Sequence, residues 1–506
     1  MLFLQVCRRC KAFFIPQVHQ IYFATAHNIA HSKINGEILK KMGYKKGDFK
    51  RVLPKKRTIR ELNLEKVVNK LHELGFTHED IRKQPKIMWL HPFLIDHRYN
   101  ILEESGMTKK LITLEKIRKF PRLNSTSVQT LKQSCLISQE TDIAHNILGF
   151  SDLPRELYPP KTNDRELFGY VQTKALQIYL SWKLGLSVEE VKNKYVSHEN
   201  MYQKSIRLVM RSYDTLIHCF KLPVHKVRQN IFVLACHPEN FLEIQKCLPK
   251  LGDASIESIA CTNPKILMRP VKKMMKIVKI MRNYNVPDQG FIYYSNILTL
   301  SPDTVQERAA ALYADPVINP FFCSPRIAFL IARYHISMSR YQLLTSMKWR
   351  CLSLSLLTNV EDQFQKRINL GQDDSSKGSD MLYYLKMHLG YEIKEIKNQI
   401  MLHPFFFLLP LTLIADTLQY LLANGGVSKA DIFKALPIVL YPKEKVARWL
   451  KQVHSQPEVE HLRDEEGKVP SSVVLQLVLY YMERPHHFSG HGVWSEQDFG
   501  NVPSVQ

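Results

Sequence analysis

Apolar residues recur at intervals of three and four along most of the chain, which is the spacing that one face of an α-helix requires. The clearest example lies between residues 64 and 76, where four apolar residues fall on one side of a helix: Val67, Val68, Leu71 and Leu74. Gly75 follows and is expected to end this helix, because glycine accepts the left-handed backbone that helix ends often use.

Two further helices are predicted directly after this stop. Thr77 can cap a new helix, and Asp80 stands three residues later, where the acid of a capping box belongs. Pro85 fits the first turn of a third, short helix, because the N–H that proline lacks would have no partner there.

The same order of glycine, cap, helix and proline returns further along the sequence, most clearly at Gly252, Ser255 and Pro264 and again at Gly426, Ser428 and Pro437. Pro85 and Pro121 lie 36 residues apart, so we expect a unit of about three dozen residues. Alternating strand patterns are lacking. We therefore predict an all-α superhelical solenoid, in which each unit buries its apolar side against its neighbours.

Residues 71–87 read LHELGFTHEDIRKQPKI. This stretch resembles the repeat of the mitochondrial transcription termination factor (mTERF) family, and the resemblance extends over roughly residues 60–450. It implies a left-handed superhelix whose units each hold two α-helices and a short 3-10 helix. It also implies an animal, insect-like paralogue that binds nucleic acid along a basic concave groove in the organelle, acts as a monomer there, and is not an enzyme.

The charge balance agrees with a polyanionic partner. The 506 residues hold 70 Lys and Arg against 47 Asp and Glu, a formal net charge of +23. Such an excess favours binding to nucleic acid or to an anionic membrane surface, and by itself it does not separate the two.

The first 36 residues contain no acidic residue and mix basic, aromatic and aliphatic side chains. This composition is typical of a mitochondrial presequence, and it predicts that the mature protein lies in the mitochondrion, in the matrix or nucleoid. A secretory signal is the alternative, because Leu2–Val6 is apolar, but this run is short and precedes the charges. Residues 37–60 are rich in lysine and are expected to form a mobile lead-in.

Composition also divides the remaining chain. We expect a first block of repeats over 61–369, a polar loop over 370–380, and further repeats over 381–450. Two stretches lack the repeat pattern and are expected to be irregular: Leu153–Pro160 and Pro316–Pro325. The tail, 451–506, is predicted to be partly disordered, with a helix at Val473–Met482 that caps the array.

Catalytic and membrane functions find little support. The most apolar stretch, Met401–Ala415, is too short for a membrane span and contains two prolines. Phosphate-loop, dinucleotide-binding, zinc-protease and serine-hydrolase motifs are absent, so no catalytic residue, cofactor or metal is predicted. His486, His487 and His491 could bind a metal, but a flexible tail is the preferred interpretation.

The strongest candidate for binding is a basic stretch that no acid interrupts between residues 258 and 287. It contains seven bases: Lys265, Arg269, Lys272, Lys273, Lys276, Lys279 and Arg282. Val271, Met274, Met275 and Val278 form the opposite, apolar side of the same predicted helix. Phosphate contact is the functional interpretation. A solvated surface or a membrane-associated helix is the alternative.

Further candidates accompany the prolines that punctuate the repeats: Arg82, Lys83, Lys86, Arg118, Lys119, Arg122, Arg326 and Lys434. Helix N-termini offer free N–H groups, so nearby bases could complete anion sites along a groove. Exposed bases near helix caps, without a binding role, remain the alternative for each.

Three functions follow from these features. The first is a protein that binds double-stranded mitochondrial DNA and modulates or terminates transcription, as the resemblance implies. The second is an rRNA-binding factor in mitochondrial ribosome assembly. The third is a scaffold whose concave face binds an acidic protein; transcription or ribosome-assembly proteins are the expected protein partners.

Overall fold

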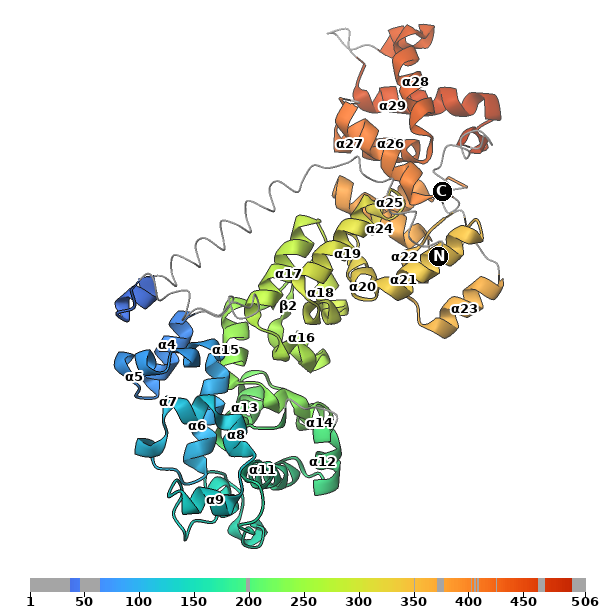
Figure 1. Cartoon of the computed structure of the whole chain (residues 1–506). Helices are drawn as coiled ribbons and strands as arrows, with labels where there is room; N and C mark the ends of the chain where they lie inside the picture. The colour runs from blue at the N-terminus through green and yellow to red at the C-terminus, as the bar shows by residue number, and fades with distance from the viewer. Residues whose placement is uncertain are drawn as a thin grey trace, which may run out of the picture. The chain divides into compact units, whose positions relative to one another are not determined.

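The computed structural model describes residues 37–45, 64–196, 201–349, 351–370, 377–401, 403–404, 406, 409–424, 426–462 and 469–493. Within these ranges helices follow one another along the whole chain (Figure 1). The named strands are a single tight hairpin, β1 (Lys250–Leu251) and β2 (Ala254–Ser255). The prediction of an all-α repeat architecture is confirmed. The presequence predicted at 1–36 lies outside the described residues.

The repeating unit is a short α-helix, a 3-10 helix of five residues and a longer α-helix. It is clearest in five places: α5 (His78–Lys83), η3 (Pro85–Trp89) and α6 (Pro92–Glu104); α14 (Val224–Gln229), η8 (Ile231–Ala235) and α15 (Pro238–Cys247); α16 (Ile256–Thr262), η9 (Pro264–Met268) and α17 (Val271–Asn283); α18 (Gln289–Tyr293), η10 (Ser295–Thr299) and α19 (Pro302–Ala314); α27 (Lys429–Lys434), η13 (Leu436–Leu440) and α28 (Lys443–Gln452). Successive 3-10 helices η8, η9 and η10 begin 33 and then 31 residues apart, so these units are shorter than the 36 residues predicted.

The 3-10 helices of the repeats share a buried third residue and the same backbone hydrogen bond. The third residue of each is fully or almost fully buried, and its carbonyl accepts a hydrogen bond from the backbone N–H that follows the helix: Ile87, Val233, Ile266, Ile297 and Ile438. Proline occupies the first or second position of η3, η9 and η13, where no N–H is needed. The predicted short third helix is therefore present.

The predicted caps are also present. Thr77 and Asp80 form a complete capping box at the start of α5. The hydroxyl oxygens of Ser255 and Ser428 accept hydrogen bonds from backbone N–H groups of α16 and α27. Gly75 has a φ of +89°, so it ends α4 (Leu64–Glu73) in the left-handed region, as predicted.

The chain divides into two compact units, Met1–Glu239 and Asn240–Gln506. The first unit also contains η4 (Lys109–Leu111), α7 (Leu114–Arg118), α8 (Phe120–Asn124), α9 (Val128–Gln133), α10 (Ile143–Leu148), η5 (Arg155–Leu157), α11 (Phe168–Leu184), α12 (Val188–Val196), α13 (Ile206–Asp214) and the π-helical turn η7 (Thr215–Cys219). In the lead-in that was predicted to be mobile, Leu39 and Met42 are buried, because they are apolar and pack into this unit. Residues 46–60 of the lead-in lie outside the described residues.

The second unit adds η11 (Asn319–Cys323), α20 (Ile327–Ala332), α21 (Tyr334–Ser346), α22 (Leu354–Thr358), α23 (Glu361–Leu370), α24 (Lys377–Leu389), α25 (Ile393–Ile400) and α26 (Leu411–Asn424). It ends with η14 (Val453–Ser455), η15 (Pro457–Leu462), α29 (Ser471–Glu483), η16 (Arg484–His486) and η17 (His491–Val493). The stretch Pro316–Pro325, expected to be irregular, contains the regular helix η11, whose second residue is a proline.

Helices extend into both ends of the loop predicted over 370–380. α23 ends at Leu370 and α24 begins at Lys377, while residues 371–376 lie outside the described residues. The buried carboxylate of Asp380 accepts hydrogen bonds from Leu354 N and Ser353 Oγ. α24 is therefore bonded to the repeat that precedes the loop, and the division between compact units falls at Glu239 instead.

Three buried or half-buried arginines connect successive helices in the same way. Each is the seventh residue of a long helix, and its Nη1 donates to carbonyls at the end of a following short helix: Arg98 to Ile117 and Arg118, Arg308 to Ile331 and Ala332, and Arg340 to Leu357 and Asn359. Each guanidinium also lies over an aromatic ring, that of Phe120, Tyr334 or Phe364. We call these three groups the arginine clamps. They satisfy carbonyls that a helix end would otherwise leave without a partner.

A buried carboxylate connects the start of α13 to the end of α6. Glu104 is fully buried and accepts hydrogen bonds from the Ser205 hydroxyl and from the backbone N–H groups of Ile206 and Arg207. Burial raises the pKa of Glu104 to about 7, although these hydrogen bonds oppose the shift.

This raised pKa predicts a loss of stability as pH rises. A carboxyl with an unfolded pKa near 4.5 and a folded pKa near 7 favours folding below about pH 4.5, and that contribution disappears as pH rises to about 7. Glu104→Gln cannot ionise. Its free energy of unfolding relative to wild type should therefore increase by about 2 to 3 kcal/mol between pH 5 and pH 8. Urea unfolding at both pH values measures this difference, and a constant difference would contradict the prediction.

Candidate nucleic-acid interface

Helix α17 carries its lysines on one side and most of its apolar residues on the other. Its buried side consists of Val271, Met274, Ile277, Val278 and Met281, which pack against the following repeat. Met275 was predicted on this side but is 45% exposed, and Ile277 lies there in its place. The stripe follows the turn of the helix, 3.6 residues, so position 277 faces the core and position 275 does not.

The exposed side of α17 carries four lysines, which we call the lysine face: Lys272, Lys273, Lys276 and Lys279. None of them makes an ion pair with any residue that the structure describes. Lys265 on η9 and Arg269, just before α17, are also exposed. Positive charges without nearby carboxylates are available to an external anion.

Arg282 was predicted to belong to this set, but its charge is already balanced. Its Nε and Nη2 donate to the two carboxylate oxygens of Asp288, at 3.0 and 2.6 Å. Asp288 also accepts a hydrogen bond from Gly252 N in the β1–β2 hairpin. The hydrogen bond from Arg282 lowers the pKa of Asp288 and raises that of Arg282. The acid-free stretch ends one residue before Asp288, so the sequence window concealed this partner.

The bases around η3 differ in their surroundings. Lys83 pairs with Glu79 at 2.9 Å, but both side chains are about two-thirds exposed, so water screens the pair strongly. Arg82 is exposed and lies beside the turn at Gly43, where Nη1 is 3.1 Å from the position that a Cβ would take. Lys86 is exposed on η3.

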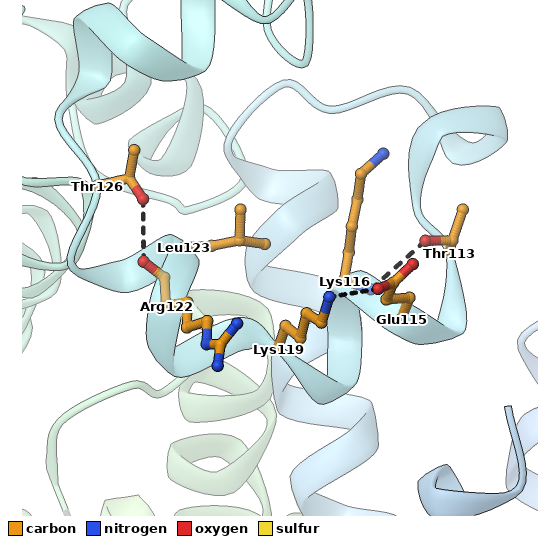
Figure 2. A pocket seen from close by; sticks show the side chains of 7 residues that line it. All are labelled: Thr113, Glu115, Lys116, Lys119, Arg122, Leu123 and Thr126. Carbon is orange, nitrogen blue, oxygen red and sulfur yellow. Dashed lines mark hydrogen bonds and ion pairs between the residues drawn. The ribbon is translucent and has the colours of Figure 1, made fainter.

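The bases around Pro121 surround a shallow depression of about 240 Å³, which Figure 2 shows. Thr113, Glu115, Lys116, Lys119, Arg122, Leu123 and Thr126 line it. Lys119 lies close to Glu115, which lowers the pKa of that carboxyl, while Arg122 is exposed. Arg118 is half-buried and its Nε has no hydrogen-bond partner, so it belongs to the packing beneath this surface.

Two predicted bases lie elsewhere in the second unit. Arg326 Nη1 is 3.8 Å from Oδ1 of Asp380, and burial raises the pKa of that carboxyl. Arg326 therefore partly balances a buried acid. Lys434 is exposed at the end of α27.

Some basic residues were not found by the sequence analysis. Lys116 lines the first depression and donates through Nζ to Leu111 O. Lys366 and Arg367 on α23 line a second depression of about 400 Å³. These residues do not closely flank a proline, so the pattern that located the other bases did not mark them.

A comparison with curated proteins finds a relative of this chain. The chain is 25% identical over 455 residues to "Transcription termination factor 5, mitochondrial" of Drosophila melanogaster, and the match covers 89% of this chain and 80% of the relative. This similarity supports the resemblance of the chain to the mTERF family. The match covers most of the repeat region, and the relative is an animal protein, as the sequence predicted. Comparisons with family models and with solved structures found no match.

A largely buried ion cluster in the first unit has the donors of a metal site but already contains a cation. Asp96, His237 and Glu239 place one ligand atom each within 4.8 Å of one another. Lys70 Nζ lies 2.9 Å from Glu239 Oε1 and 3.6 Å from Asp96 Oδ2, so its ammonium balances the two carboxylates. The cluster therefore joins α4, α6 and α15 as an internal ion network.

The chain near the C-terminus is folded as far as Val493, so the histidines that it carries do not lie in a flexible tail. The predicted helix at Val473–Met482 is present within α29 and buries one side of its residues. Glu483, at its end, accepts hydrogen bonds from Gly490 N, Gly492 N and the Tyr441 hydroxyl. These bonds fix the segment that carries His486, His487 and His491.

Among the residues described, no helix combines the length and apolarity needed to cross a membrane.

Proposed function

We propose that this protein belongs to the mTERF family, binds the phosphate backbone of double-stranded mitochondrial DNA and regulates transcription, by termination or by modulation. The observation that supports this most is the lysine face of α17, four exposed cations without ion-pair partners among the described residues. The Drosophila relative is named as a mitochondrial transcription termination factor, which supports the process and the organelle.

The mechanism would be electrostatic and steric. Each lysine that neutralises a phosphate releases condensed counterions, which supplies affinity without reading the sequence. A stack of repeats held on the duplex would obstruct or position a polymerase. Groove contacts would supply any sequence specificity. No catalytic step is part of this function, and the protein would act as a monomer on the nucleic acid.

A membrane role for α17 is less favoured than the sequence alone suggested. A basic amphipathic helix binds a bilayer by burying its apolar side among the lipids. In α17 that side is already buried in the protein: Val271 is 5% exposed and Met274, Ile277 and Met281 are fully buried. Only the charged side remains to attract an anion.

The deciding experiment compares bound DNA and bound RNA in the same cells. The protein is cross-linked and immunoprecipitated from mitochondria, and both nucleic acids are sequenced. Enrichment of discrete mitochondrial DNA sites supports the proposal. Enrichment of rRNA alone would replace it with a role in ribosome assembly, and recovery of neither would favour a protein scaffold. A variant lacking the lysine face serves as the matched control, because it should lose the enrichment.

A further inference from the structure

Two corners of the chain, one in each compact unit, share one construction. α7 and α22 are both helices of five residues, and each leads within three residues into another helix, α8 or α23. Thr113 and Ser353 are their N-cap residues. The two short helices occupy positions exactly 240 residues apart in the numbering, from 114 to 118 and from 354 to 358.

At each of these corners an arginine clamp is hydrogen-bonded to the end of the short helix. Arg98 donates to Ile117 O at 3.1 Å, and Arg340 donates to Leu357 O at 3.0 Å. The two carbonyls are again 240 residues apart, while the two arginines are 242 apart. Both arginines are 7% exposed. The last carbonyls of a helix carry partial negative charge that repels anions. The clamp places a guanidinium against these carbonyls and reduces that repulsion at the corner. In the second corner Nη2 of Arg340 also donates to the exposed carboxylate of Glu361, at 2.8 Å.

Each corner borders a depression, and the two linings follow the same spacing. The first is the depression of Figure 2, and the second has a volume of about 400 Å³. Four positions of one lining correspond to four of the other, each 240 residues apart: Glu115 and Ser355, Lys119 and Asn359, Leu123 and Gln363, Thr126 and Lys366.

Both linings carry a positive charge. The first contains Lys116, Lys119 and Arg122 against one acid, Glu115. The second contains Lys366 and Arg367 and no acid in its lining. Neither Lys366 nor Arg367 makes an ion pair within the part of the chain that the structure describes.

The third clamp offers a natural contrast. Arg308 makes the same bonds to the end of α20. Five residues beyond the clamped carbonyl, where the first corner has Arg122, this corner has Ile336, which is 48% exposed, and the second corner has Asp362. The clamp is thus a feature of the fold, while the charged residues around it differ from corner to corner.

We propose that the α7–α8 and α22–α23 corners are phosphate-binding sites, one in each unit, for the backbone of a nucleic acid. An arginine fork and a lysine beside it suit the tetrahedral oxygens of a phosphodiester. The inference rests on the proposed nucleic-acid function and assigns to it Lys366 and Arg367, which the proline pattern did not indicate. The neutral side chains Ser355, Asn359 and Gln363 could donate further hydrogen bonds to the same phosphate.

The test uses the full chain with a duplex DNA and a single-stranded RNA of random sequence, titrated over a series of salt concentrations. Two double variants are compared with wild type: Lys119→Ala with Arg122→Ala, and Lys366→Ala with Arg367→Ala. The second variant removes two unpaired bases, so it should weaken DNA binding roughly tenfold at low salt and reduce the slope of log K against log salt by about two. The first variant should reduce the slope by about one, because Lys119 is paired with Glu115 and only Arg122 is unpaired. Lys394→Ala with Lys397→Ala on α25 removes two exposed lysines elsewhere in the second unit and should leave the slope unchanged.

The outcomes separate this inference from the proposed function. If wild type binds and both corner variants keep its salt slope, the corners are not phosphate sites while the proposed function stands. If wild type binds neither probe, both proposals fail. A slope that falls equally in the α25 control would also overturn the inference, because the effect would then reflect total charge. Circular dichroism checks that each variant is folded. The double variant Lys366→Glu with Arg367→Glu reverses both charges and should weaken DNA binding further than the alanine variant does.

Discussion

Replacing Lys272, Lys273, Lys276 and Lys279 together by alanine should weaken binding to duplex DNA on the order of a hundredfold at low salt. The slope of log K against log salt should fall by about three and a half, because each lost phosphate contact removes about 0.9. The fold should persist, since the four side chains are exposed and alanine is the strongest helix former. Fluorescence anisotropy over a salt series measures both quantities.

Arg282 provides the matched control on the same helix. Its guanidinium is held by Asp288, so Arg282→Gln removes a charge of the same sign from α17 without removing a free cation. Its salt slope should stay close to that of wild type. If Arg282→Gln lowers the slope as much per residue as the lysine variants do, the distinction between paired and unpaired bases is wrong. If the fourfold variant keeps the wild-type slope, the lysine face is not part of the interface.

The sequence predicted the local structure of the repeats well, because that structure depends on neighbouring residues. Thr77 caps α5, Gly75 ends α4 and Pro85 opens η3, and each does so through contacts within a few positions. The length of the unit was predicted less well. It was measured from Pro85 to Pro121, and Pro121 lies in the α-helix α8 rather than in a 3-10 helix of the regular kind.

The sequence could predict the candidate site only where the position of a charged side chain follows from its neighbours in the chain. The lysine face follows from helical spacing alone, so the sequence located it. Whether a base is free depends on partners further away: Arg282 meets Asp288 across a turn, and Arg326 faces Asp380, which is 54 residues away. The clamps were missed for the same reason, since the partners of Arg340, Leu357 and Asn359, lie in the next repeat.

The clamp at Arg98 should dominate the local stability of the α7–α8 corner. Its guanidinium is buried, donates to two carbonyls at the end of α7 and lies 5.6 Å from the ring centroid of Phe120. Burial lowers the pKa of Arg98, yet an arginine stays charged, so the helix carbonyls and the ring serve as its counter-charge. Alanine at this position would leave a cavity and two carbonyls without partners.

We therefore expect Arg98→Ala to destabilise this corner by about 3 kcal/mol. Repeat arrays often unfold in parts, so a single melting temperature would conceal the effect. Hydrogen exchange resolves it: amides of α7 and α8 should exchange about a hundredfold faster, while those of α28 in the other unit stay unchanged. Arg98→Lys should fall between, because one ammonium cannot reproduce the fork. Unchanged protection at α7 would show that the carbonyls find other donors, and uniform loss across both units would show that Arg98 supports the whole fold rather than one corner.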